Sequence, residues 1–303
     1  MRKALVLCVM SGLLSAQAWS DVVIDDEALL ISIELRCEEL RGKGELHTVS
    51  ELAKDCDGRR CELAFAPVVK EPLAPPLLRA RLCRSTLVVG HYYECKDCHD
   101  FHFTASSGFA VGKAGVIATC YHLLEDDSGL PAACLVVADW AGNVWPVTSV
   151  LAADRAADVA LLQCTATNLL PLPLRLDVCA GERIWCLSNP DHLFASFSEG
   201  LIARRYVVRS AAPGMAPLVD PEAAPVGHKK VVDQKARVLT FLQVTCEFAV
   251  GSSGGPVVDA CGNLVGIAQS TTTVFADPET EPVETQMVVR SAVPSAALRA
   301  LLK

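Results

Sequence analysis

The sequence has no excess of positive charge and, beyond its first residues, no long apolar run. Its 35 acidic side chains outnumber its 27 basic ones, so the formal net charge is −8 at pH 7. A protein that binds nucleic acid needs a basic surface, so the charge argues against nucleic acid as the main partner. A membrane-spanning helix needs about 20 consecutive apolar residues. No segment after the N-terminus has them, and we expect no membrane association once the N-terminal segment is removed.

The N-terminal segment has the pattern of a secretory signal peptide. Arg2 and Lys3 precede an apolar run over residues 4–14, and the small residues Ala16 and Ala18 follow. A charged start, a short apolar stretch and a small-residue cleavage site are the three parts of such a signal. We therefore assign residues 1–18 to a signal peptide and predict that the chain is exported, to the periplasm or the medium of a bacterium.

Cysteine is abundant, with 14 residues, of which Cys8 leaves with the signal peptide. Export to an oxidising compartment would make disulfides plausible, and the odd number that remains leaves at least one thiol free or paired with another chain. Cys56 and Cys61 flank a polar turn and could close a hairpin disulfide. The sequence does not determine the other pairings.

A second cysteine cluster lies at residues 95–102. Cys95, Cys98 and His99 match the attachment pattern of c-type haem, and His102 and His91 could extend the cluster to a zinc site. We favour a loop disulfide between Cys95 and Cys98, and expect no metal and no cofactor. A metal site on Cys95, Cys98, His99 and His102 and a haem site remain as alternatives.

Residues 251–256, with the sequence GSSGGP, are typical of a turn that presents a nucleophilic serine. A serine hydroxyl is a poor nucleophile unless a base takes its proton and nearby donors hold the oxyanion. The glycines let the backbone fold tightly, so that the N–H groups of Gly251 and Ser253 can point at one spot. Strand-like residues 257–259 and 264–267 follow, separated by a turn. This context favours Ser253 as a nucleophile.

A serine nucleophile also needs a histidine and an acid that orients the histidine. His122 ends an apolar strand over residues 115–121, and a strand over residues 107–112 precedes it. Asp158 opens an apolar strand, where a buried carboxylate needs a partner. Asp154 is the alternative acid, but it lies in the polar turn before that strand.

The order His122, Asp158, Ser253 and the contexts of the three residues resemble the trypsin-like serine peptidases of the HtrA/Deg type. The resemblance covers roughly residues 85–303. It is closest to single-domain bacterial peptidases of this type, and we expect no downstream PDZ domain. The matching segments are residues 107–109, 119–122, 158–162, 188–190, 198–202, 242–245 and 251–256.

The resemblance implies an all-β fold of two six-stranded antiparallel barrels with the triad in the cleft between them. It places the first barrel at about residues 85–172, the second at about 178–290 and a closing helix at about 293–302. Residues 19–84 lie outside the resemblance and form a small N-terminal extension. Within the extension, residues 28–40 have helical spacing, and residues 49–53 could add a further turn of helix.

The implied activity is that of a serine endopeptidase, which hydrolyses peptide bonds of protein or peptide substrates through an acyl-enzyme. Ser253 would attack the carbonyl carbon, His122 would carry the proton and Asp158 would orient His122. The N–H groups of Gly251 and Ser253 would hold the oxyanion.

Substrate selection and activation are less specified by the sequence. Glu247 lies six residues before Ser253, where related peptidases place an acid that selects Lys or Arg. The substrate pocket would also include Ile267, Ala268 and Gln269.

Ser252 stands where zymogen-activated relatives have an acid, so activation by a newly formed N-terminus is not expected. Residues 204–239 and 271–284 are expected to form long loops.

Two alternatives remain for the function. The chain could be a catalytically silent binding protein built on the same barrels, or an exported metal or redox protein that uses its Cys/His cluster. The oligomeric state does not follow from the sequence.

Overall fold

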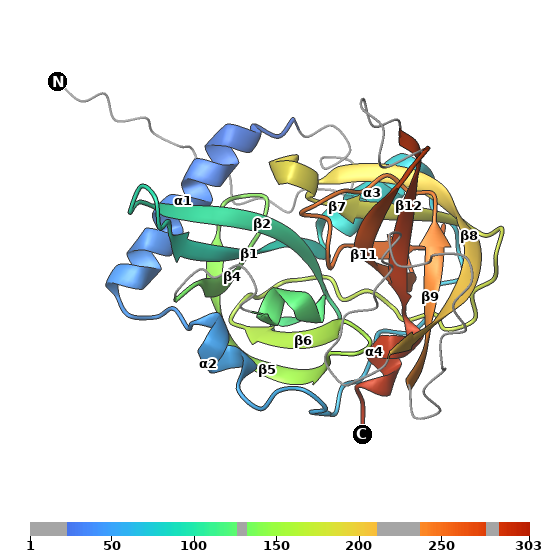
Figure 1. The fold of residues 1–303 in the computed structure, drawn as a ribbon, viewed down its shortest axis with the longest axis horizontal. Coiled ribbons are helices and arrows are strands. Elements are labelled where there is room, and N and C mark those ends of the chain that lie inside the picture. The colour runs from blue at the N-terminus through green and yellow to red at the C-terminus, as the bar shows by residue number, and fades with distance from the viewer. Residues whose placement is uncertain (1–22, 126–131, 211–236, 277–284) are drawn as a thin grey trace.

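The computed structural model describes residues 23–125, 132–210, 237–276 and 285–303, which form two closed six-stranded barrels side by side (Figure 1). The first barrel has the strand order β1-β2-β3-β6-β5-β4 and the second β10-β11-β12-β9-β8-β7. All neighbouring strands pair antiparallel. The prediction of an all-β fold of two barrels is confirmed.

The first barrel closes around large apolar side chains that alternate with outward-facing ones along the strands. Phe109, Ile117, Leu135 and Leu161 come from four different strands, and all are fully buried. The strands are β1 (Thr86–Glu94), β2 (Phe101–Ala110), β3 (Val116–Thr119), β4 (Cys134–Ala138), β5 (Val144–Asp154) and β6 (Val159–Cys164).

The second barrel contains β7 (Arg183–Ser188), β8 (Ser196–Ser210), β9 (Arg237–Val244), β10 (Pro256–Val258), β11 (Leu264–Phe275) and β12 (Thr285–Pro294). The closing helix α4 spans Ala296–Ala300 and is shorter than the expected 293–302. The reason is that Val293 and Pro294 still pair with β11, so the helix begins only after the strand has ended.

Parts of the two expected loops are strand. β8 continues to Ser210 and β9 starts at Arg237. Both ends of the loop expected at residues 204–239 therefore belong to the antiparallel pair of β8 and β9. Likewise, residues 271–275 belong to β11 and pair with β12. The remainder of both loops, residues 211–236 and 277–284, lies outside the described residues, as does the expected signal peptide.

The N-terminal extension forms three helices, α1 (Asp26–Gly42), α2 (Val49–Ala53) and α3 (Pro75–Cys83). The Asp25 carboxylate accepts a hydrogen bond of 3.0 Å from the Ala28 amide and caps the start of α1. Leu29, Ile33 and Cys37 follow at four-residue spacing and are buried against the first barrel. Both helices expected in this region, around residues 28–40 and 49–53, are therefore confirmed. Among the described residues, no helix has the length and apolar character to cross a membrane.

After α2 the extension runs on to the second barrel and to the C-terminus. The Cys61 amide donates to the Leu301 carbonyl at 3.1 Å, and the Lys303 amide donates to the Cys61 carbonyl at 3.0 Å. Farther along, the Asn263 side chain bonds both the amide and the carbonyl of Val69 at 2.8 Å. The extension therefore crosses both barrels and ties them to the last residues of the chain.

Candidate active site

The first barrel supplies a histidine–aspartate pair. His122 lies in a 3₁₀ turn, η2 (Tyr121–Leu124), directly after β3, and Asp158 lies in the turn that leads into β6. The Asp158 carboxylate accepts a hydrogen bond from the His122 amide at 2.9 Å. Both of its oxygens also lie near His122 Nδ1, at 3.1 and 3.0 Å. The backbone bond fixes the carboxylate under the ring, so that Nδ1 faces Asp158.

The pair is electrostatically coupled. Burial alone would lower the pKa of His122, but attraction to the Asp158 carboxylate and their hydrogen bond outweigh burial, and the pKa is raised. Burial would raise the pKa of Asp158, but the histidine charge and the hydrogen bonds from His122 outweigh it, and the pKa is lowered. The Asp158 side chain is 8% exposed and that of His122 is 40% exposed, so the acid is buried and the base reaches the surface.

Asp154, the alternative acid, has a different role. Arg237 binds its carboxylate through two hydrogen bonds of 2.8 and 2.6 Å, and the carboxylate also caps the Ala157 amide at 3.0 Å. Asp154 therefore joins β5 to β9 of the second barrel and does not contact His122.

Cys120 lies beside the pair, with its sulfur within 4.8 Å of the ligand atoms of His122 and Asp158. Its thiol donates to the Ala268 carbonyl at 3.3 Å, and burial raises its pKa well above the usual range. A metal binds the thiolate form of cysteine, so the raised pKa of Cys120 disfavours a metal ion at this cluster.

The second barrel supplies Ser253, in the loop between β9 and β10. Its Oγ donates to the Gln269 carbonyl at 3.1 Å. Among the described residues, no hydrogen bond joins Ser253 Oγ to His122. The hydroxyl therefore has to leave the Gln269 carbonyl before the histidine can take its proton.

The turn before and after Ser253 requires glycine. Gly251 has a φ of +89° and Gly254 a φ of +86°, in the left-handed region that side chains rarely adopt. A Cβ on Gly251 would lie 2.5 Å from the Asn189 carbonyl oxygen. A Cβ on Gly254 would overlap the Ser107 carbonyl oxygen. The close approach of the loop to β2 therefore depends on both glycines.

The backbone amides of this loop divide into two sets. Those of Ser252, Gly254 and Gly255 donate to the carbonyls of Ala249, Ala268 and Ser252, each at 2.9 Å. Within the described chain, the amides of Gly251 and Ser253 have no hydrogen-bond acceptor. The Val250 carbonyl accepts from the Asp191 amide at 2.8 Å, and in a planar trans peptide this turns the Gly251 N–H to the opposite side. The loop that carries the Ser253 hydroxyl therefore contains two unpartnered amide donors, one of them on Ser253 itself.

Ser252 is fully buried and belongs to a neutral network. Its Oγ accepts a hydrogen bond from the Ser188 hydroxyl at 3.0 Å and another from the Ala249 amide at 3.2 Å. The network holds the loop without a charged group. Ser252 therefore does not supply the acid that a newly formed N-terminus would bind in zymogen-activated relatives. The network also removes Ser252 as a nucleophile.

Ser107 and Asn189, to which no sequence pattern assigns a role, hold the two barrels together at the site. The Ser107 amide donates to the Ser253 carbonyl at 2.9 Å, and its hydroxyl donates to the Gly251 carbonyl at 3.0 Å. The Asn189 amide in turn donates to the Ser107 hydroxyl at 3.0 Å. Both residues lie in the motif segments of the sequence, but their pairing is a tertiary contact between β2 and the loop after β7.

The predicted substrate-pocket residues lie in different environments. Ile267 and Ala268 point to opposite faces of β11 and are fully buried in two different apolar clusters, so they do not line an open pocket. Gln269 lies beside Asp158 and helps to lower its pKa. Glu247 is 73% exposed and forms an ion pair with Arg290, whose guanidinium also donates to the Phe248 carbonyl at 3.1 Å. Arg290, which the sequence analysis missed, therefore neutralises Glu247.

All 13 cysteines of the described chain are free thiols, so neither expected disulfide, Cys56–Cys61 or Cys95–Cys98, is formed. Cys95, Cys98 and His102 lie together at the tip of the hairpin of β1 and β2. His99 is not part of this cluster; its Nδ1 lies 3.7 Å from a Glu94 carboxylate oxygen.

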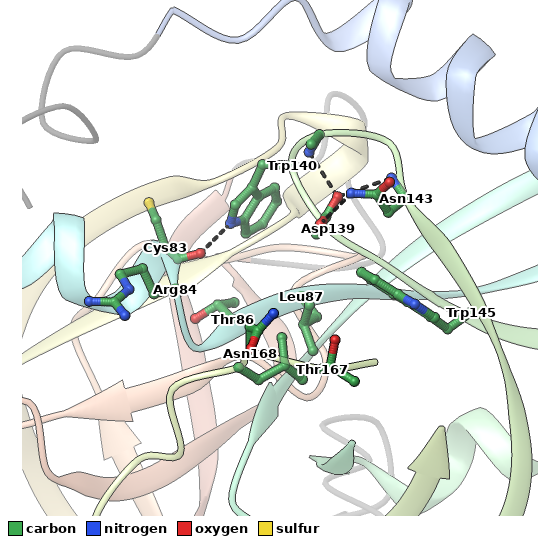
Figure 2. Close-up of a pocket in the computed structure, with 12 residues that line it drawn as sticks. Cys83, Arg84, Thr86, Leu87, Asp139, Trp140, Asn143, Trp145, Thr167 and Asn168 are labelled. Carbon is green, nitrogen blue, oxygen red and sulfur yellow. Dashed lines mark hydrogen bonds between the residues drawn. The ribbon is translucent and has the colours of Figure 1, made fainter. Parts of the chain in front are cut away.

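A surface pocket of about 610 Å³ lies elsewhere on the first barrel (Figure 2). Trp140 and Trp145 line it, and the Trp140 indole donates to the Cys83 carbonyl at 2.7 Å. Asp139 and Asn143 hydrogen-bond each other at its rim. None of the site residues predicted from the sequence lines this pocket.

Comparisons with known proteins agree with this geometry. A family model described as trypsin-like peptidase domain matches residues 106–267. Serine endoprotease DegS of Haemophilus influenzae is 28% identical over 54% of this chain and 40% of its own length. The chloroplastic Protease Do-like 1 of Arabidopsis thaliana is 29% identical over 54% of this chain and 32% of its own length. The chain thus spans less than half the length of these two relatives.

A solved structure of an HtrA-type protease with a tripeptide superposes with a TM-score of 0.50. It has 17% identity and covers 75% of this chain and 62% of its own. At this identity the likeness shows the fold alone. The family match covers more than half of the chain, and the chain therefore belongs to the trypsin-like peptidases, among the relatives of the HtrA/Deg type.

Proposed function

We propose that this protein is a serine endopeptidase that hydrolyses peptide bonds of protein or peptide substrates through an acyl-enzyme. The observation that carries the proposal is the link that Gln269 makes between the two barrels: its carbonyl accepts from the Ser253 hydroxyl at 3.1 Å, and it lies beside Asp158, which binds His122. The unpartnered amides of Gly251 and Ser253 belong to the same loop as the hydroxyl. Gly251 is buried, and buried backbone amides are almost always paired, so its unused donor is typical of a site that binds a ligand oxygen.

The catalytic cycle begins with the tautomer of His122. Asp158 accepts a hydrogen bond from the Nδ1–H group of His122, so Nε2 carries a lone pair and is the base. Ser253 Oγ leaves the Gln269 carbonyl, gives its proton to Nε2 and attacks the carbonyl carbon of the substrate. The developing oxyanion accepts hydrogen bonds from the amides of Gly251 and Ser253.

Collapse of the tetrahedral intermediate releases the amine product. The protonated His122 donates its Nε2 proton to the departing nitrogen, and Asp158 stabilises the positive ring during this step. Water then enters, His122 takes its proton, and attack on the acyl group restores the Ser253 hydroxyl.

The Glu247–Arg290 pair bears on substrate selection. An acid selects a Lys or Arg side chain through an uncompensated negative charge, and Arg290 compensates the charge of Glu247. We therefore propose that the enzyme does not strongly prefer cleavage after basic residues.

We also propose that the chain is exported, on the grounds of the signal-peptide pattern over residues 1–18. Edman sequencing of the protein from a bacterial host tests this. A new N-terminus near residue 19 in the periplasmic or secreted fraction is expected, and full-length protein retained in the cytoplasm would contradict it.

A second candidate function is peptide binding without cleavage. The observation that favours it is the Ser253 hydroxyl, which donates to Gln269 and not to His122. A protein held in that arrangement would keep the cleft but lack an activated nucleophile.

One experiment separates the two. The protein is incubated with an unfolded protein substrate and a mixed peptide library, beside the matched variants Ser253→Ala and Ser252→Ala. Cleavage by the wild type and by Ser252→Ala, but not by Ser253→Ala, is the expected result. Peptide binding without cleavage in all three proteins would support the silent alternative and contradict the peptidase.

A further inference from the structure

The hairpin of β1 and β2 carries a cluster of two thiols and an imidazole that the proposed peptidase chemistry does not use. Cys95 and Cys98 lie in the turn after β1, and His102 is the second residue of β2, paired with Tyr93. The two sulfurs and a ring nitrogen of His102 all lie within 4.8 Å of one another. Cys98 Sγ and His102 Nε2 are 3.0 Å apart.

Backbone hydrogen bonds hold the turn that carries the two sulfur atoms. The turn is closed by hydrogen bonds from the Cys95 amide to the Asp100 carbonyl at 2.8 Å and from the His99 amide to the Cys95 carbonyl at 3.0 Å. The closed turn holds the two sulfurs close enough to each other and to His102 to share one ion.

His99 shows why the cluster uses His102. His99 has a φ of +60°, a left-handed conformation that lets the chain turn back after Cys98. This carries its ring toward Glu94 and away from the sulfurs. The pattern of c-type haem requires the histidine that directly follows the second cysteine, so the geometry disfavours haem.

We propose that Cys95, Cys98 and His102 bind one zinc ion, with a fourth position open to solvent. Zinc favours four ligands at tetrahedral angles, with Zn–S of about 2.3 Å and Zn–N of about 2.0 Å, which sets S and N ligand atoms about 3.5 Å apart. Cys98 Sγ and His102 Nε2 need to separate by only about half an ångström to reach this spacing. Cys98 and His102 are exposed, so the ion has an entry path.

The ion would clamp the tip of the β1–β2 hairpin. Five residues along β2 from His102 lies Ser107, whose amide and hydroxyl hold the nucleophile turn. The zinc site therefore braces the same strand that positions the proposed active site, but no zinc ligand belongs to that site. Zinc binding is expected to raise the unfolding temperature of the protein, because a ligand that binds only the folded state stabilises it.

The test uses the full-length protein, purified under reducing conditions and freed of metal. Cobalt(II) serves as the probe, because a tetrahedral site with thiolate ligands gives charge-transfer and visible absorption bands. One cobalt ion per chain and displacement of these bands by one equivalent of zinc are expected. Cys95→Ser, Cys98→Ser and His102→Ala should each lower the affinity at least tenfold.

Two matched variants control for the other thiols and for the neighbouring histidine. Cys179→Ser removes another exposed cysteine, and His99→Ala removes the histidine of the same turn that lies outside the cluster. Both should keep the cobalt bands and the rise in unfolding temperature with zinc. Circular dichroism of all variants checks that each is folded.

The proposal is overturned if the reduced protein binds no cobalt, or if His102→Ala binds it as the wild type does. A Cys95–Cys98 disulfide in protein isolated without reductant from zinc-supplied cells would also overturn it. These results do not depend on peptidase activity, so the zinc site and the proposed function fail or succeed separately.

Discussion

Replacing Asp158 by asparagine tests the electrostatic core of the site with minimal change of shape. The asparagine oxygen can keep the 2.9 Å hydrogen bond from the His122 amide, which places its NH₂ group against Nδ1. The amide then donates to Nδ1, so the proton of His122 must reside on Nε2. His122 then has no lone pair toward Ser253 and cannot act as the base.

The expected loss of reaction rate in Asp158→Asn has two causes. His122 no longer acts as a base, and the negative charge that stabilises its protonated ring is gone. In serine hydrolases of this design the combined effect is about 10⁴-fold in turnover, equivalent to about 5 kcal/mol of transition-state stabilisation. The assay is the rate of Ser253 modification by a fluorophosphonate, which reports nucleophile activation without knowledge of the substrate. Asp158→Asn should react at least a thousandfold more slowly than the wild type.

Asp154→Asn is the matched control, because Asp154 is the other buried aspartate before β6. Its carboxylate binds Arg237, which is half exposed and can be rehydrated. Replacing the Asp154 carboxylate should therefore cost about 1–2 kcal/mol of stability. The modification rate should change little. The reasoning is refuted if Asp158→Asn reacts nearly as fast as the wild type, or if Asp154→Asn is the slower of the two.

Three further predictions concern the turn, the pH dependence and the pocket. Gly254→Ala should lower the free energy of unfolding by about 3 kcal/mol or more in a denaturant titration, because its Cβ would overlap the Ser107 carbonyl oxygen. Gly58 has open space around it, so Gly58→Ala should cost only about 1 kcal/mol. Equal losses for the two variants would contradict this. The modification rate should rise with pH through a midpoint above the usual histidine value of about 6.5, because His122 must be neutral and its pKa is raised; a midpoint below that value would contradict the coupling to Asp158. Arg290→Ala should leave the charge of Glu247 uncompensated and increase cleavage after Lys or Arg, measured on a peptide library, and an unchanged profile would show that Glu247 does not face the substrate.

The two barrels were predicted from the resemblance to a known family, whereas local sequence patterns indicated the proposed catalytic groups. Each of His122, Asp158 and Ser253 lies next to a strand with strong apolar character, so its position relative to that strand could be inferred. The helix α1 could also be predicted, because its buried positions recur at four-residue spacing.

Contacts between distant segments could not be predicted from the sequence. Nothing in the sequence around Arg290 indicates that β12 brings it to Glu247, 43 residues earlier. The choice of His102 over His99 depends on the backbone conformation at His99 and on the register of β1 with β2. The path of the extension across both barrels depends on single hydrogen bonds, such as those of Cys61 and Asn263, that leave no periodic pattern.

The central claim is that Ser253 is a nucleophile activated by its surroundings, and its most direct test is to locate a covalent adduct. The protein is treated with a fluorophosphonate and digested, and the modified residue is identified by mass spectrometry. The neighbouring Ser252 is an internal control, because it is equally a serine but buried in a neutral network. We expect one adduct per chain, on Ser253 and absent from Ser253→Ala. No adduct, or an adduct on another serine, would contradict it.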